Sequence, residues 1–176
     1  MRLALVTTVL AMVLPSVAAP AISFAAAAKD PTPAQISKAM RTAKRSKTLW
    51  ATVNICNSRS HPDQLGIRGQ MPSLGFPAWL SMRIQLNYYS NSQKKFVVDP
   101  GSTKLIRLGR SRAGLLQGGW VYAFNPHAGL LDATVNFYWR RSGKLLGSTT
   151  ETTTGGHRGA DFGSPAHFTA AQCRIP

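Results

Sequence analysis

The sequence predicts an all-β protein, an antiparallel β-sandwich of about seven to nine short strands. From Thr48 onward, apolar residues recur at every second position, which is the period of a half-buried strand. Clusters of Gly, Pro, Asn, Asp and Ser separate these stretches, and no strong helical period follows residue 47. We therefore expect a signal peptide at 1–28, a basic linker or amphipathic helix at 29–47, and the sandwich domain at 48–176.

The first segment has the features of a secretory signal. Arg2 precedes an uncharged apolar run of 12 residues from Leu3 to Leu14, and small residues follow. Ala26-Ala27-Ala28 suits a cleavage site, and Ala19-Pro20-Ala21 is a second candidate. The alternative is an uncleaved anchor, but the run is short of the roughly 20 residues that span a bilayer. We expect a secreted or envelope-associated protein.

Residues 29–47 begin with a helix-start signal. Pro33 suits the first turn of a helix, with Thr32 as its cap. Three apolar residues then recur at helical spacing, namely Ile36, Met40 and Ala43, and the segment carries six basic residues and Asp30, a net charge of +5. Two alternatives follow: a cationic helix on an anionic membrane, and a solvated tether that is only partly helical. Because three apolar positions bury little area, the tether is favoured.

The first strand carries one of the two cysteines. Residues 48–56 alternate, so that Leu49, Ala51, Val53 and Ile55 share one face and Cys56 lies on the other. Two cysteines in an exported chain favour a disulfide, which would join Cys56 to Cys173. Because alternation places Cys56 opposite the aliphatic face, either a bulge turns it inward or the bond lies at the sandwich edge, joining first and last strands. The pattern favours the edge.

The remaining strands follow from alternation and turn signals. Residues 57–77 are expected to be a loop, with one short edge strand at 67–72. The clearest alternation runs from 79 to 89. The even-numbered residues, Leu80, Met82, Ile84, Leu86 and Tyr88, are expected on the buried face, and the odd-numbered residues from Trp79 to Tyr89 on the polar face. The segment 130–140 directs Val135, Phe137 and Trp139 inward. Further strands are expected at 95–98, 104–108, 119–124, 144–154 and 166–175, with loops at 109–119 and 155–163.

The strand count, Cys56, Trp139 and the stretch Phe168-Thr-Ala-Ala-Gln-Cys173 carry a resemblance over residues 47–176. In these features the chain resembles an immunoglobulin-like or fibronectin-III-like sandwich of the kind that bacteria export. Membership of that class implies adhesion or recognition more often than catalysis.

The chain is strongly basic. It has 21 Lys and Arg against 6 Asp and Glu, a net charge of +15, and removal of residues 1–28 takes away Arg2 alone and leaves +14. This charge favours anionic partners, such as cell-envelope polymers or a membrane surface, although it also serves solubility. Basic and aromatic side chains that could form a binding surface are Arg107, Arg110, Arg112, Tyr138, Arg140 and Arg141.

Catalytic and metal-binding motifs are missing from the sequence. It has no Gly-x-Ser-x-Gly elbow, no phosphate-binding glycine motif and no histidines at metal-ligand spacing. We therefore expect a binding module that is not an enzyme, with no cofactor, no metal and no nucleic-acid partner. The alternative is a hydrolase of cell-envelope polymers, which would use some of His61, Asp63, His157 and Asp161.

Overall fold

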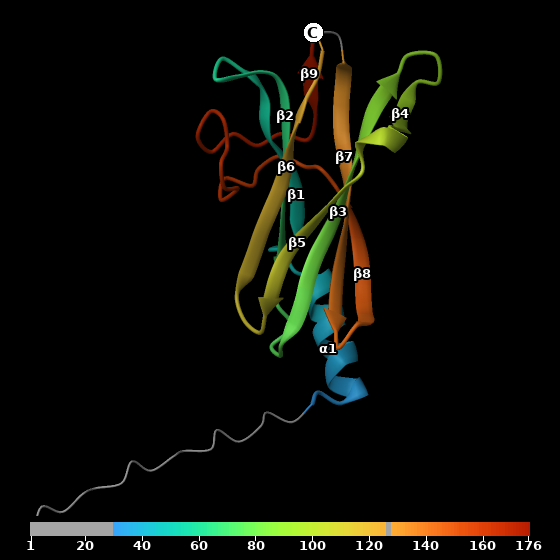
Figure 1. The fold of residues 1–176 in the computed structure, drawn as a ribbon, viewed down its shortest axis with the longest axis vertical. Coiled ribbons are helices and arrows are strands. Elements are labelled where there is room, and N and C mark those ends of the chain that lie inside the picture. The colour runs from blue at the N-terminus through green and yellow to red at the C-terminus, as the bar shows by residue number, and fades with distance from the viewer. Residues whose placement is uncertain (1–29, 126–127) are drawn as a thin grey trace, which may run out of the picture. The chain divides into compact units, whose positions relative to one another are not determined.

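The computed structural model describes residues 30–125 and 128–176, and the expected signal peptide lies outside them. The described chain is mostly antiparallel β-structure, as the sequence predicts, with one α-helix (Figure 1). Its strands form two sheets. The smaller sheet has the order β1 (Trp50–Ser58), β2 (His61–Pro72), β6 (Leu115–Ala123).

The larger sheet is organised around one long pair, β3 (Ala78–Ser90) and β7 (Gly129–Arg141). On the side away from β7, β3 pairs with two shorter strands, β5 (Lys104–Ser111) and β4 (Lys95–Val98). The 3-10 turn η1 (Pro100–Ser102) lies between these two in the chain. Two others share the free edge of β7, namely β8 (Lys144–Thr152) and β9 (Cys173–Ile175). The loop expected at 109–119 is therefore largely strand, because β5 and β6 leave only residues 112–114 as a turn.

Both sheets contribute to one hydrophobic core. On β3 and β7 the expected alternation is confirmed over most of their length, since Met82, Ile84 and Phe137 are fully buried with their alternate neighbours. It is wrong at the end of β3, where Tyr88 is exposed and Asn87 is buried. Trp139 is also fully buried, and its indole Nε1–H donates to the carbonyl of Pro72 at 2.8 Å. A buried tryptophan needs such a partner for its single donor.

The segment 57–77, expected to be a loop with a short edge strand at 67–72, instead contains the central strand of the smaller sheet. Strand β2 pairs with β1 on one side and β6 on the other, and it buries Leu65, Ile67 and Met71. Glycines at 66 and 69 hid this strand from the sequence pattern, because they leave gaps in its alternation. At Gly69 a Cβ would lie 2.8 Å from the sulfur of Met82, so core packing requires the glycine.

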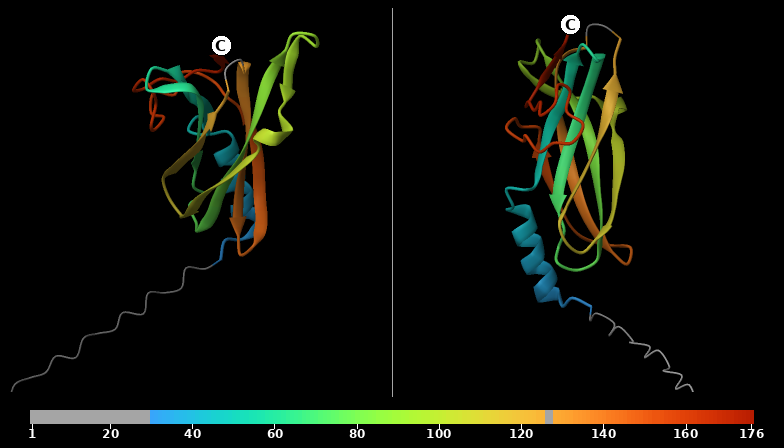
Figure 2. Two further views of the ribbon diagram at one scale, coloured as in Figure 1. Left: turned by 45° about the horizontal axis from the view of Figure 1, so that its top comes forward. Right: turned by 90° about the vertical axis from the view of Figure 1, so that its left-hand side faces the viewer.

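The structure has a helix within residues 29–47, but it matches neither alternative, because its apolar side packs against the protein core and not on a membrane or in solvent. Helix α1 (Pro33–Lys44) begins with a capping box, in which Thr32 and Gln35 exchange side-chain and backbone hydrogen bonds. Met40 is buried and lies so close to β8 that a Cβ at Gly147 would be 2.6 Å from its methyl group. The apolar side of α1 therefore belongs to the core, and its basic side chains are exposed. Figure 2 shows α1 running along one side of the strands.

The final strand is much shorter than expected, because only Cys173–Ile175 is strand instead of 166–175. Residues 153–172 instead form an irregular segment, which we call the C-terminal cover, along the edge of β1 that β2 leaves unpaired and over its outer face (Figure 1). Val53 forms an isolated bridge with Ala170 in this segment, and the Thr52 hydroxyl donates to the carbonyl of Ala170. This contact buries the polar face of β1 as well as its apolar face.

The expected disulfide between Cys56 and Cys173 is confirmed, with a Cα–Cα distance of 5.4 Å and a sequence separation of 117. Val53 pairs with Ile67 while Ile55 pairs with Gly66, so Asn54 is an extra residue. This β-bulge reverses the alternation and places Cys56 on the same face as its partner Leu65, toward the core. Ile55, expected on the core face with Val53, therefore lies on the outer face instead. The bulge alternative is therefore present, and the bond also joins an edge strand of one sheet to an edge strand of the other.

Candidate functional site

The outer face of the larger sheet collects most of the basic and aromatic residues predicted to bind a ligand. Cross-strand pairing places Trp79 of β3 between Arg110 of β5 and Arg140 of β7. The next outward position of β3, Ser81, lies between Arg107 and Tyr138 in the same way. These residues point outward because they alternate with the buried residues of the same strands.

These side chains line an open groove of about 510 Å³, which we call the basic groove. Its lining residues are Trp79, Leu80, Ser81, Arg83, Leu105, Arg107, Tyr138 and Arg140. A smaller adjoining hollow of about 190 Å³ is lined by Pro77, Trp79, Arg110, Arg141 and Ser142. Trp79 is common to both and leaves 57 % of its surface exposed, which makes its ring available to a ligand.

Local contacts hold the cations at one end of the groove. The guanidinium of Arg140 lies over the ring of Tyr138, 5.1 Å from its centroid. Arg141 donates to the carbonyl of Pro77 at 2.6 Å, and its guanidinium lies 6.0 Å from the ring of Phe76. Such stacking keeps an arginine oriented while its charge remains available.

No acidic side chain is among the described residues that line the basic groove or the adjoining hollow. Asp132 lies farther along β7, where it pairs with Asn87 of β3. It is buried, and Asn87 Nδ2 donates to Asp132 Oδ1 at 2.7 Å. Burial raises the pKa of Asp132, and this hydrogen bond partly offsets the rise. The groove is therefore a positively charged surface with the exposed ring of Trp79 and the half-buried ring of Tyr138.

Of the six residues predicted as a binding surface, the structure brings five to the groove and its hollow, and Arg112 lies outside both, in the turn after β5. Sequence reasoning missed Trp79, Arg83 and Leu105 as members of this surface. The signal was present for the first two, because alternation in 79–89 already places them on the polar face.

The residues considered for hydrolysis have separate neighbours. His157 stacks on Trp50 with ring centroids 4.8 Å apart, and its Nε2 lies 2.8 Å from the Thr154 hydroxyl. Burial lowers the pKa of His157, which favours its neutral form. His61 Nδ1 lies instead 3.1 Å from the hydroxyl of Ser164.

Metal-binding clusters are also missing: no three His, Cys, Asp or Glu side chains in the part of the chain that the structure describes could hold a metal ion together. That part also contains no helix long and apolar enough to cross a membrane. Fold and site together define an antiparallel all-β protein with one disulfide between its sheets and a basic, aromatic groove on its larger sheet.

Comparison with known proteins adds little to this class. No family model and no curated protein matches the chain. Among solved structures, it is similar to the sporulation control protein Spo0M from Bacillus subtilis, with a TM-score of 0.29 and 8 % identity over 61 % of this chain and 49 % of that one. It is also similar to the Pseudomonas fluorescens alkylpurine DNA glycosylase AlkC bound to DNA containing an abasic site analog, with a TM-score of 0.29 and 14 % identity over 60 % and 29 %. The chain thus spans about half of the first protein and under a third of the second.

Proposed function

We propose that this protein is a secreted, non-catalytic binding module whose basic groove holds an anionic polymer of the cell envelope. The observation that supports the proposal is the row of arginines and aromatic rings across β5, β3 and β7, with no acidic side chain lining it in the described residues. A groove that crosses three strands suits a chain-like ligand, because successive charged groups of one chain can meet the cations of β5, β3 and β7.

The chemistry of the side chains supports the choice of an anionic partner. Arg107 and Arg140 can each bind a carboxylate, sulfate or phosphate with two parallel hydrogen bonds. Trp79 and Tyr138 offer ring faces that can stack against a sugar or a base. Because the groove is open to water, its binding energy is largely electrostatic and must weaken with salt.

The proposal of export rests on the leader-like residues 1–28 and on the disulfide. A bond between Cys56 and Cys173 persists in an oxidising compartment and is rare in a reducing one. The finer assignment to an immunoglobulin-like sandwich remains part of this proposal, supported by the strand count and by two antiparallel sheets that share one core.

The test compares two variants that remove the same charge from different places. The groove variant carries Arg107→Gln, Arg110→Gln and Arg140→Gln. The control variant carries Lys38→Gln, Arg41→Gln and Lys44→Gln on the exposed side of α1. Binding of fluorescently labelled heparin, an anionic polysaccharide, is followed by anisotropy from about 0.05 to about 0.5 M NaCl.

We expect the groove variant to bind heparin at least about tenfold more weakly, and the control variant to stay close to the natural protein. Trp79→Ala should also weaken binding without changing its salt dependence, because it removes a ring and no charge. Equal losses in both triple variants would show that net charge alone drives binding, and binding that does not weaken with salt would also contradict the proposal. Binding only to anionic lipid vesicles would replace the polymer by a membrane surface.

One observation favours the alternative, a hydrolase of envelope polymers. The contact between His61 Nδ1 and Ser164 Oγ, at 3.1 Å, has the separation of a base and the nucleophile it activates. Two further hydroxyls, of Ser58 and Ser60, lie 2.9 Å from the same oxygen. Release of soluble fragments from isolated cell envelopes that Ser164→Ala abolishes would favour this alternative over a pure binding module.

A further inference from the structure

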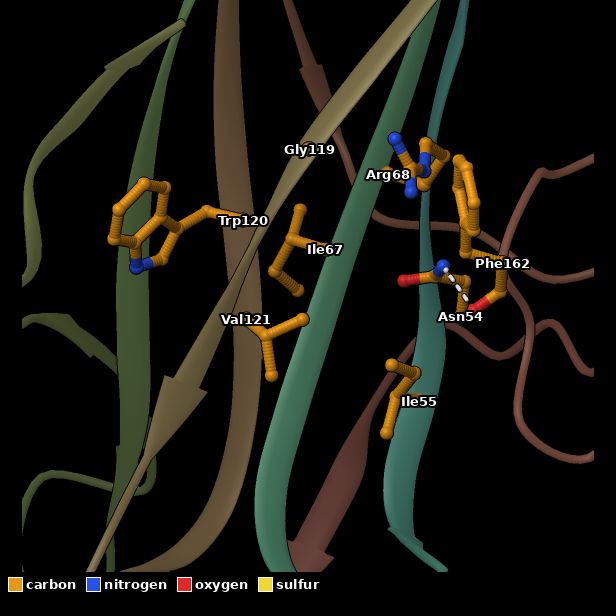
Figure 3. Close-up of a pocket in the computed structure, with 8 residues that line it drawn as sticks. All are labelled: Asn54, Ile55, Ile67, Arg68, Gly119, Trp120, Val121 and Phe162. Atoms are coloured by element: carbon orange, nitrogen blue, oxygen red, sulfur yellow. Dashed lines mark hydrogen bonds between the residues drawn. The ribbon is translucent and has the colours of Figure 1, made fainter. Parts of the chain in front are cut away.

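A second concave site lies on the outer face of the smaller sheet, on different strands from the basic groove. It is a pocket of about 310 Å³ between β1, β2, β6 and the C-terminal cover (Figure 3). Arg68, Phe162, Ile55 and Val121 supply side chains to it, while Trp120 directs its indole away from Phe162. The lining is mostly apolar, with Arg68 as its charged side chain.

Glycine opens the space beside Arg68. On β6 its cross-strand neighbour is Gly119, which has no side chain to fill the outer face. A Cβ at Gly119 would lie 2.2 Å from the carbonyl oxygen of Ile67, so the close approach of the two strands admits only glycine. The floor of the pocket is therefore bare backbone next to a guanidinium.

The wall opposite Gly119 is Phe162, whose backbone the fold holds in an unfavourable conformation. Phe162 leaves 79 % of its surface exposed and has a φ of 56°, in the left-handed region that a bulky residue rarely adopts. Asn54, which is only 2 % exposed, holds this backbone by donating to the carbonyls of Asp161 at 2.8 Å and Phe162 at 3.1 Å. Strained residues held by buried polar groups, and bulges such as the one at Asn54, concentrate at binding sites.

The cation beneath this ring has an unused donor. The Arg68 guanidinium lies 4.9 Å from the centroid of the Phe162 ring. Its Nε is buried and has no hydrogen-bond partner in the described chain, which is costly for a charged group. Burial lowers the pKa of Arg68, and attraction to Asp161 offsets only part of that effect. An anionic group in the pocket would complete the solvation that the arginine lacks.

We propose that this pocket binds a small organic carboxylate with an apolar body. The planar carboxylate matches the guanidinium edge of Arg68 and accepts two parallel hydrogen bonds once the exposed ring of Phe162 swings aside. The apolar body lies on Ile55 and Val121, under the returning ring. One arginine fits one negative charge, and the volume is at the lower end of the range for small-molecule sites.

The test uses benzoate as the acid and benzamide as its neutral counterpart of the same shape. Each is titrated into the full folded protein, and amide and arginine Nε–H chemical shifts are followed by NMR. We expect saturable shifts at Arg68, Gly119 and Val121 with benzoate, and binding of benzamide at least about tenfold weaker. Isovalerate, an aliphatic acid, should shift the same signals.

Variants separate this site from the basic groove. Arg68→Gln should abolish saturable benzoate binding, and Phe162→Ala, which changes an exposed side chain and keeps the arginine, should weaken it. Arg107→Gln in the basic groove is the matched control and should leave it unchanged. Equal binding of benzamide, unchanged binding by Arg68→Gln, or no saturable shifts with either acid would overturn the proposal. None of these results depends on whether the groove binds heparin.

Discussion

Removing the disulfide should cost this protein much of its stability. We consider the double variant Cys56→Ala/Cys173→Ala, whose side chains leave no reactive thiol. The bond closes a loop with a sequence separation of 117. In the chain-entropy model, its loss raises the conformational entropy of the unfolded chain and so lowers the free energy of unfolding by about 5 kcal/mol at 25 °C. Since single domains are stable by only about 5–15 kcal/mol, the variant should be marginally folded.

The change can be measured by guanidinium chloride unfolding, followed through tryptophan fluorescence. With an m-value of about 4 kcal/mol/M, a loss of about 4–5 kcal/mol lowers the midpoint by about 1 M. The slope itself should increase in the variant, because an unfolded chain without the cross-link exposes more surface. The natural protein treated with a reducing agent is the control, and it should unfold as the variant does.

Two results would refute this reasoning. A loss below about 1 kcal/mol would mean that the unfolded state is compact enough to keep Cys56 and Cys173 close without the bond. Faster hydrogen exchange confined to β9 and the C-terminal cover, with the remaining strands unchanged, would mean that the bond stabilises only the segment it anchors.

Three further substitutions test other parts of the structure. Gly119→Ala should destabilise the protein by about 2 kcal/mol, because its Cβ meets the backbone of β2, whereas Gly159→Ala, with open space around it, should be near neutral in thermal unfolding. Trp139→Phe should cost about 2–3 kcal/mol in denaturant unfolding, since it leaves a cavity and an unpaired carbonyl. Asp132→Asn should raise the melting temperature at pH 7. The raised pKa of Asp132 means that the folded state favours the protonated acid. The natural protein therefore loses stability as pH rises from the pKa of the unfolded state through that of the folded state. A melting temperature of the variant that does not fall over this pH range would confirm that the pKa is raised.

The elements that the sequence predicts well are those in which local pattern and burial agree. Strands β3 and β7 alternate cleanly because one face meets the core and the other meets water. Strand β2 was not predicted, because its glycines are required by residues distant in sequence, such as Met82, which packs against Gly69. Burial of both faces of β1 could not be predicted for a similar reason, since part of its cover comes from residues 153–172.

The candidate site follows the same division. Arg107, Tyr138 and Arg140 could be chosen from the sequence because charge and aromatic character are local properties. That they meet across β3 depends on strand order, which alternation does not specify. The pocket at Arg68 could not be predicted from the sequence, because its shape depends on the bulge at Asn54 and on the backbone conformation of Phe162.

The C-terminal cover also constrains the order in which the molecule can be assembled. A chain that emerges from a ribosome or crosses a membrane starting at its N-terminus presents β1 long before residues 153–172 exist beside it. During that interval Trp50 and Ile55, which are buried in the finished protein, face water on a strand at the edge of its sheet. Uncovered edges of this kind pair readily with other chains. Shielding of β1 by a chaperone until the cover arrives should therefore increase the yield of folded protein during synthesis.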